Sequence, residues 1–209
     1  MHMAWSRGAD RIWVVNVGDL KPVEIPINHF FDMAYDADKW GVDKTEDWAK
    51  AWAAREFGPG VASDTAEVMM KFGMYSNRRK FELVEPHVYS VIHYNEADAV
   101  LEQWARLAEQ AQGIYAKLDS SAQPAFFQLI LHPILGGQIL HKIYIGAAKN
   151  ALYAGQKRNS ANDVINTVLQ YSGDDANLTM RWNQMLGGKW NHMMDRTKLS
   201  FVSRDRLMR

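Results

Sequence analysis

Residues 95–118 read NEADAVLEQWARLAEQAQGIYAKL, and this stretch decides the fold class. Asn95 can cap the start of a helix. Apolar side chains then recur every three or four residues, at Val100, Trp104, Leu107, Ala111, Ile114 and Leu118. This spacing places them on one face of an α-helix. Helices with such a stripe pack nearly antiparallel to their neighbours in bundles. The stretch therefore predicts a mainly α protein.

Helical patterns continue on both sides of that stretch. Thr45 or Asp43 can cap a helix that ends before Gly58, and Ser63 or Asp64 can cap the next one. Further helices are expected over residues 123–131, over residues 134–157, and from about residue 160 to Gly187-Gly188. Pro133 is expected to interrupt or bend the chain, and Gly173 to divide the last helix in two. The sequence predicts a bundle of about five or six helices.

The front of the chain has a different pattern. Residues 11–17 contain the apolar run Ile12-Trp13-Val14-Val15 and end at Gly18-Asp19, which favours a short strand buried on both faces. A loop over residues 18–26 then leads to a helix with Phe30. We expect one strand-loop-helix unit with its neighbouring strands missing over residues 1–37, a helical bundle over 38–199 and a frayed tail over 200–209.

Composition limits the classes of function. Lysine plus arginine and aspartate plus glutamate number 24 each, so no overall charge attracts nucleic acid or an anionic membrane. The N-terminal residues form no signal peptide, and no run of about 18 apolar residues is present. The chain has no cysteine, which removes disulfides, thiolate metal sites and cysteine nucleophiles. These observations leave the cellular compartment open.

Polar residues gather where the predicted strand ends. In parallel barrels this end of a strand forms the rim of the active site. Asn16 offers both a donor and an acceptor, so it is the one candidate for contact with a substrate, whereas Asp19 and Lys21 could pair and brace the loop.

The sequence predicts neither a metal site nor a cofactor. A carboxylate-bridged metal centre in a bundle needs a glutamate three positions before a histidine, and no histidine here has one. His192 and Asp195 have helical spacing but no third ligand, and buried, hydrogen-bonded roles are favoured for His132 and His141. The aspartate pairs 32/36 and 174/175 do not face each other across a sugar, so no catalytic residue is assigned.

Three blocks of sequence resemble glycoside hydrolase family 115, the xylan α-1,2-glucuronidases: residues 11–22, Leu131-His132-Pro133, and residues 187–195, GGKWNHMMD. The likeness extends over most of residues 7–199. It implies a much longer enzyme with a catalytic α/β barrel, a helical bundle and further domains. This chain would be a fragment of it, with residues 1–37 as the C-terminal strand-loop-helix remnant of the α/β barrel, followed by the bundle. It also implies inverting removal of glucuronic acid or its 4-O-methyl ether from xylan. Full-length relatives are expected to be secreted or periplasmic.

Under this resemblance the catalytic carboxylates lie outside the chain, Asn16 contacts the sugar, and the fragment alone is inactive. The expected partner is glucuronoxylan or its oligosaccharides, with a homodimer as a further expectation and no nucleic acid or membrane. One alternative is a stand-alone helical module that binds carbohydrate or protein. Another is a non-functional truncated gene product, which predicts poor solubility because residues 12–17 would expose unpaired strand edges.

Overall fold

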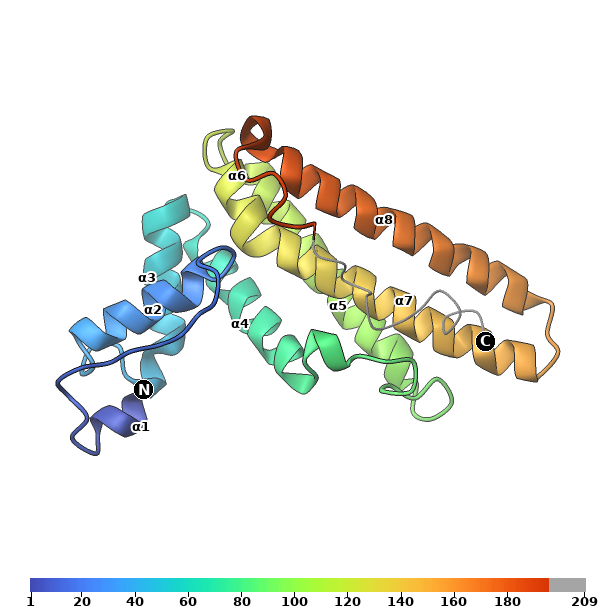
Figure 1. The fold of residues 1–209 in the computed structure, drawn as a ribbon, viewed down its shortest axis with the longest axis horizontal. Helices are drawn as coiled ribbons and strands as arrows, with labels where there is room; N and C mark the ends of the chain where they lie inside the picture. The colour runs from blue at the N-terminus through green and yellow to red at the C-terminus, as the bar shows by residue number, and fades with distance from the viewer. Residues whose placement is uncertain (196–209) are drawn as a thin grey trace.

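The protein is a mainly α structure in the computed structural model, which describes residues 1–195 (Figure 1). The α-helices are α1 (His2–Trp5), α2 (Glu24–Tyr35), α3 (Thr45–Phe57), α4 (Ala62–Arg78), α5 (Glu96–Lys117), α6 (Gln123–Phe126), α7 (His132–Gly155) and α8 (Ser160–Gly188). Two short 3-10 turns, η1 (Val42–Lys44) and η2 (Phe81–Leu83), precede α3 and follow α4. No strand occurs within residues 1–195, and the predicted mainly α class is confirmed.

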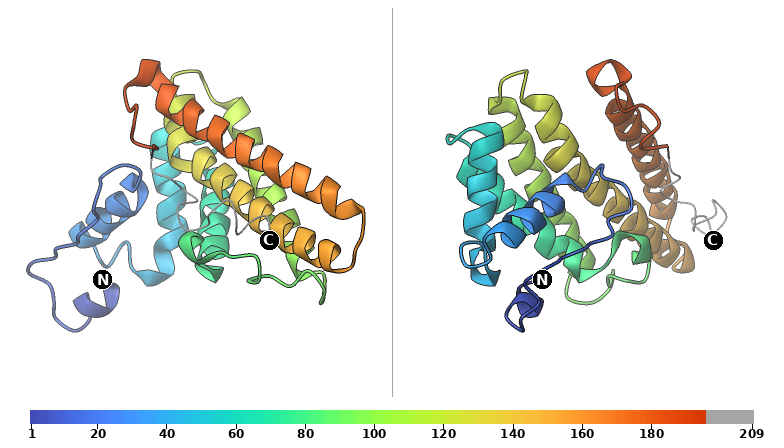
Figure 2. Two further views of the ribbon diagram at one scale, coloured as in Figure 1. Left: turned by 45° about the vertical axis from the view of Figure 1, so that its right-hand side comes forward. Right: turned by 60° about the vertical axis from the view of Figure 1, so that its left-hand side comes forward.

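The long helices follow one another in space as they do in sequence. α3 contacts α4, α4 contacts α5, α5 contacts α7, and α7 contacts α8. Both views of Figure 2 show α8 lying alongside α7. α7 therefore lies between two long neighbours and buries residues on several sides, including Ile134, Ile143 and Ile145.

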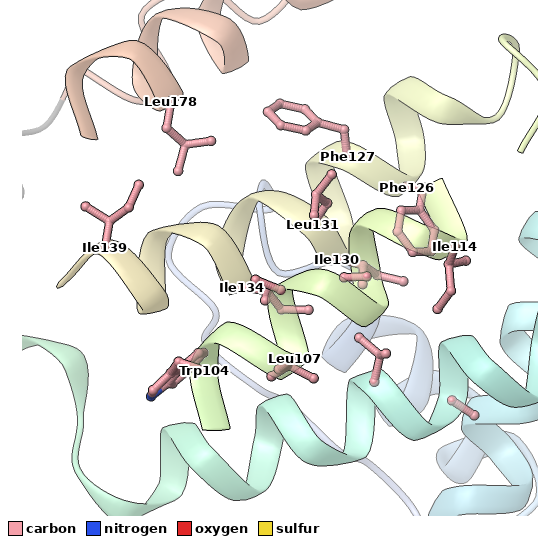
Figure 3. Close-up of a cluster of buried hydrophobic side chains, with 14 of the residues drawn as sticks. Trp104, Leu107, Ile114, Phe126, Phe127, Ile130, Leu131, Ile134, Ile139 and Leu178 are labelled. Atoms are coloured by element: carbon pink, nitrogen blue, oxygen red, sulfur yellow. The ribbon is translucent and has the colours of Figure 1, made fainter. Parts of the chain in front are cut away.

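The apolar stripe of α5 forms the centre of the core, as its spacing predicts. Trp104, Leu107 and Ile114 are almost fully buried and meet Ile130 and Ile134 from the next helical segment (Figure 3). Asn95 does occupy the N-cap position of α5, but its side chain caps nothing and its backbone is left-handed. The packing of the stripe, rather than the cap, supports this helix.

Two glycines allow close approach between helices. A β-carbon at Gly137 would lie 2.7 Å from the Trp104 ring of α5, and one at Gly146 would lie 2.5 Å from Cγ2 of Val168 in α8. Real β-carbons do not approach other atoms so closely. Gly137 is therefore a glycine at a contact between two helices.

Pro133 does not interrupt the helical path, which corrects one of the two outcomes predicted for it. A π-helical turn, η3 (Phe127–Leu131), joins α6 to α7, and the chain continues helically through Pro133. Proline has no N–H to donate to the preceding turn, and a wider turn ahead of it accommodates that loss. The predicted division of the last helix at Gly173 is also absent, because regular helical geometry fails only at Met185, Leu186 and Gly187.

The predicted strand over residues 11–17 is not formed. These residues have no regular structure and no ladder, and Ile12 and Val14 are 84% and 86% exposed. A strand needs a neighbour to satisfy its backbone groups, and residues 1–195 supply none. Only the strand is missing from the predicted unit, because the loop and the following helix, α2, are present as predicted.

The front helix is attached to the bundle. His29 of α2 stacks on Trp48 of α3 with ring centroids 4.4 Å apart, and the Trp48 indole Nε1 donates to Asp32 Oδ2 at 2.8 Å. Arg55 of α3 donates to the Asn28 side chain. The division between parts at residue 37 stays a prediction, and the predicted tail at residues 200–209 lies outside the described residues. No helix within residues 1–195 is long and apolar enough to cross a bilayer.

Candidate functional site

The predicted substrate contact, Asn16, lies on the exposed front segment. Its Oδ1 accepts a hydrogen bond from the backbone N–H of Gly18 at 3.1 Å, and Gly18 has a φ of +67°. An asparagine side chain that bonds two residues ahead in this way stabilises a turn. The structure therefore gives Asn16 a loop-shaping contact, and its role toward substrate stays a prediction.

A hollow of 330 Å³ lies between the front segment and α2. Its walls combine the aromatic rings of Trp5, Trp13 and Phe30 with the charged side chains of Asp10 and Arg11. The Trp13 and Phe30 rings lie 6.1 Å apart, and the Trp13 indole donates to the backbone oxygen of Ala9. Flat rings beside hydrogen-bonding groups are suited to the apolar faces and hydroxyl groups of sugars.

Lys21 does not pair with Asp19 as the sequence suggested. Its Nζ donates to Glu24 Oε1 at 2.5 Å and to Gln128 Oε1 at 3.0 Å, and Gln128 Nε2 donates to the same Glu24 oxygen at 2.7 Å. We name these three residues the junction cluster. Lys21 Nζ also lies 4.5 Å from the centroid of the Trp190 ring. The junction cluster thus ties the front loop to η3 and to the turn after α8.

The π-helical turn supplies Gln128 to this cluster. Gln128 is buried in η3, a type of turn that is often found at functional sites. The other carboxylate oxygen of Glu24, Oε2, is buried without a hydrogen-bond partner among residues 1–195. Sequence reasoning missed this cluster because 107 positions separate Lys21 from Gln128; the only local signal was Pro133 within a helical pattern.

His141 has a structural environment, as expected from its apolar helix. Its Nδ1 lies 2.7 Å from the Gly137 carbonyl oxygen, and its ring packs against Trp104 with centroids 4.9 Å apart. Burial lowers the pKa of His141, against the opposing effect of the Gly137 hydrogen bond. His132 is also buried, with its ring edge-on to Phe127. Burial likewise lowers the pKa of His29, while Asp32 acts in the opposite direction.

His192 and Asp195 do meet, through His192 Nδ1 and Asp195 Oδ2. Asp195 also accepts a hydrogen bond from Asn183 Nδ2 at 2.6 Å, and Asn183 Oδ1 accepts one from the Met194 N–H. The pair therefore fastens the last turn to α8. Among residues 1–195, no group of three or more histidine, cysteine, aspartate or glutamate side chains is arranged to hold a metal ion.

Comparison with known families concerns the front of the molecule. Residues 1–83 match the family model described as glycosyl hydrolase family 115. The resemblance carried by residues 11–22 is confirmed within this range, which extends through α4 and η2. The blocks at residues 131–133 and 187–195 lie beyond it and stay predictions. No curated protein matches the chain.

Proposed function

We propose that this chain is part of a family 115 glycoside hydrolase that removes glucuronic acid or its 4-O-methyl ether from xylan by inversion. The observation that carries the proposal is the match of residues 1–83 to that family. The apolar segment at residues 11–17 supports it, because Ile12 and Val14 are exposed here and would be buried beside neighbouring strands.

In this proposal the general acid and base lie outside this chain. An inverting glycosidase needs two carboxyl groups about 6.5–9.5 Å apart on opposite sides of the scissile bond. Asp32 is engaged by Trp48 and Arg55, while Asp174 and Asp175 are neighbours on one helix. Asn16 would then act as a sugar-binding residue at the end of its segment.

A segment exchange tests the proposal. Residues 1–83 would replace the matching segment of an active family 115 glucuronidase, and release of glucuronic acid from glucuronoxylan would be measured by anion-exchange chromatography. We expect release to persist in the chimaera, with a lower kcat/KM after Asn16→Ala. Loss of release in a folded chimaera would contradict the proposal. The chain by itself is expected to show no release, and turnover by it would overturn the placement of the carboxylates.

The hollow beside α2 favours one second candidate, a carbohydrate-binding module. Arg11 could pair with a uronate carboxylate while Trp13 stacks on the sugar ring. Titration of the chain with aldouronic acids, followed by tryptophan fluorescence, tests this function. Saturable binding that is lost in Arg11→Ala and Trp13→Ala, without any hydrolysis, would support it. Binding that both variants retain would argue against this hollow as the site.

A further inference from the structure

A second pocket, of 420 Å³, lies where four distant segments of the chain meet. Pro22 comes from the front loop, Phe81 from η2, Leu140 from α7 and Met194 from the turn after α8. Pockets of about 300–1,000 Å³ are typical sites for small organic ligands. Within residues 1–195 the lining shares no residue with the hollow beside α2 and does not include Asn16.

One face of α7 forms the floor of this pocket. Gly136, Gly137 and Leu140 follow Pro133 by three, four and seven positions, which places all four residues on the same side of the helix. The two glycines have no side chains, so the backbone of α7 is bare between Pro133 and Leu140. The floor is therefore a strip of helix backbone with an apolar side chain at each end.

Gly136 is the part of this floor that the packing of the fold does not explain. Gly137 makes room for Trp104, whereas a β-carbon on Gly136 would meet no atom of residues 1–195 within 4 Å. The φ of Gly136 is also not left-handed, although glycine is less favourable than alanine in the middle of a helix.

The open space at Gly136 differs from that at other helical glycines. Gly136 is half-buried, whereas the helical glycines of residues 1–195 that face open space elsewhere are exposed to solvent, namely Gly73, Gly113, Gly155 and Gly173. The space at Gly136 therefore lies inside the pocket. Glycine is the residue that lets a ligand approach a backbone closely.

The polar groups of the wall are already engaged. The amide of Gln128 is bonded through both its oxygen and its nitrogen within the junction cluster. The ring of His132 lies edge-on to Phe127, and Asp175 likewise already takes part in an interaction. Glu82 is exposed, which places its carboxylate at the rim. A charged group inside the pocket would lose its hydration without gaining a new partner from the wall that residues 1–195 form, so an uncharged ligand is favoured.

We propose that this pocket binds an uncharged aromatic molecule, with one ring lying flat on the bare backbone of α7 at Gly136. Phe81 and Ile143 supply apolar contacts to that ring, and the flexible thioether of Met194 adapts to its edge. This site goes beyond the proposed hydrolase function, because it uses neither Asn16 nor a catalytic carboxylate and offers no partner to an acidic sugar.

Four related probes test the proposal: phenylbutanol, phenylbutylamine, phenylbutanoate and cyclohexylbutanol. Their dissociation constants for the full chain would be measured at neutral pH by ligand-observed NMR titration. We expect phenylbutanol to bind with a Kd of about 1 mM or less, and both charged analogues to bind about three- to tenfold more weakly. Cyclohexylbutanol is more apolar but should also bind more weakly, because its puckered ring cannot lie flat on the helix. Equal or tighter binding of any of these three, or no binding of phenylbutanol at millimolar concentration, would overturn the proposal.

Variants at Gly136 locate the binding. Gly136→Leu should fill the pocket without a clash and weaken phenylbutanol binding at least about tenfold, since a β-carbon there meets open space. Gly136→Ala adds a single methyl group and should weaken binding by a smaller factor. Gly73→Leu is the matched control, because Gly73 is an exposed helical glycine outside the pocket, and it should leave affinity unchanged. An affinity that does not fall from glycine to alanine to leucine at position 136, or that falls equally in Gly73→Leu, would refute the site.

Glu82→Gln tests whether the carboxylate at the rim, instead of the apolar wall, excludes an anion. The change removes the charge of an exposed side chain and should leave the fold intact. Phenylbutanol should keep its advantage over phenylbutanoate in this variant. Loss of that advantage would assign the selectivity to Glu82 and contradict the proposal.

Discussion

Gly146→Ala tests whether the contact between α7 and α8 requires glycine. The new β-carbon would lie 2.5 Å from Cγ2 of Val168, and Val168 is 2% exposed with little room to move. Overpacking of this kind costs about 1–3 kcal/mol, whereas replacing a mid-helix glycine with alanine gains about 1 kcal/mol. We expect a net loss of up to about 2 kcal/mol.

A double-mutant cycle isolates the steric part of that change. Val168→Ala alone removes two buried methyl groups and should cost about 2 kcal/mol. It also removes Cγ2, after which the nearest Val168 atom to the new β-carbon is Cβ at 3.9 Å, an ordinary contact. The double variant should therefore be more stable than the sum of the single changes predicts, by about 1–3 kcal/mol.

Urea unfolding of the full chain, followed by far-ultraviolet circular dichroism, measures all four corners of the cycle. Gly113→Ala is the control, because a β-carbon there has no neighbour within 4 Å and the change should stabilise α5 by about 0.5–1 kcal/mol. If Gly146→Ala stabilises the protein as Gly113→Ala does, or if the cycle shows no coupling, the close approach of α7 and α8 is refuted.

Three further predictions concern other parts of the structure. Gln128→Leu should lower the free energy of unfolding by about 1–2 kcal/mol, because it removes the two hydrogen bonds that Gln128 makes in the junction cluster, and unchanged stability in urea would contradict those bonds. Burial lowers the pKa of His141 below its usual 6.5, so its contribution to stability is complete above that pH and declines as the pH falls toward the folded-state value. His141→Gln should flatten the pH dependence of unfolding between about pH 7.5 and pH 5.5, and an unaltered slope would count against this. Gly137→Ala should be less stable than Gly136→Ala in thermal unfolding, by about 1–3 kcal/mol, since only Gly137 faces Trp104; equal stabilities would rule out that contact.

The helical part of this fold could be predicted because its evidence is local. The spacing of Trp104, Leu107 and Ile114 identifies the buried face of α5 without any knowledge of its neighbours. The strand prediction at residues 11–17 failed for the opposite reason. A run such as Ile12 to Val15 indicates only that a strand would suit these residues, while its formation depends on partners elsewhere.

Sequence patterns likewise identified one part of the candidate site and missed another. The rule that polar residues gather after an apolar run singled out Asn16, and the structure gives that residue a turn contact. The junction cluster depends on a contact between the front loop and η3, and no pattern near Lys21 or Gln128 specifies the other residue. A π-helical turn also escapes a search for helical periods, because it adds a residue to one turn.

The turn at η3 sets the angle between two parts of one continuous rod. Each residue of an α-helix adds about 100° of rotation about the helix axis, so one additional residue changes the direction in which all the side chains after it point. The ring of Phe126, before the turn, lies 5.1 Å from the ring of Phe57 in α3, measured between centroids. The ring of His132, after the turn, lies 6.3 Å from the ring of Trp182 in α8. Deleting a single residue there would keep nearly all the same side chains yet present them to different neighbours. The length of this turn, more than the identity of any residue in it, determines which helices α6 and α7 hold together.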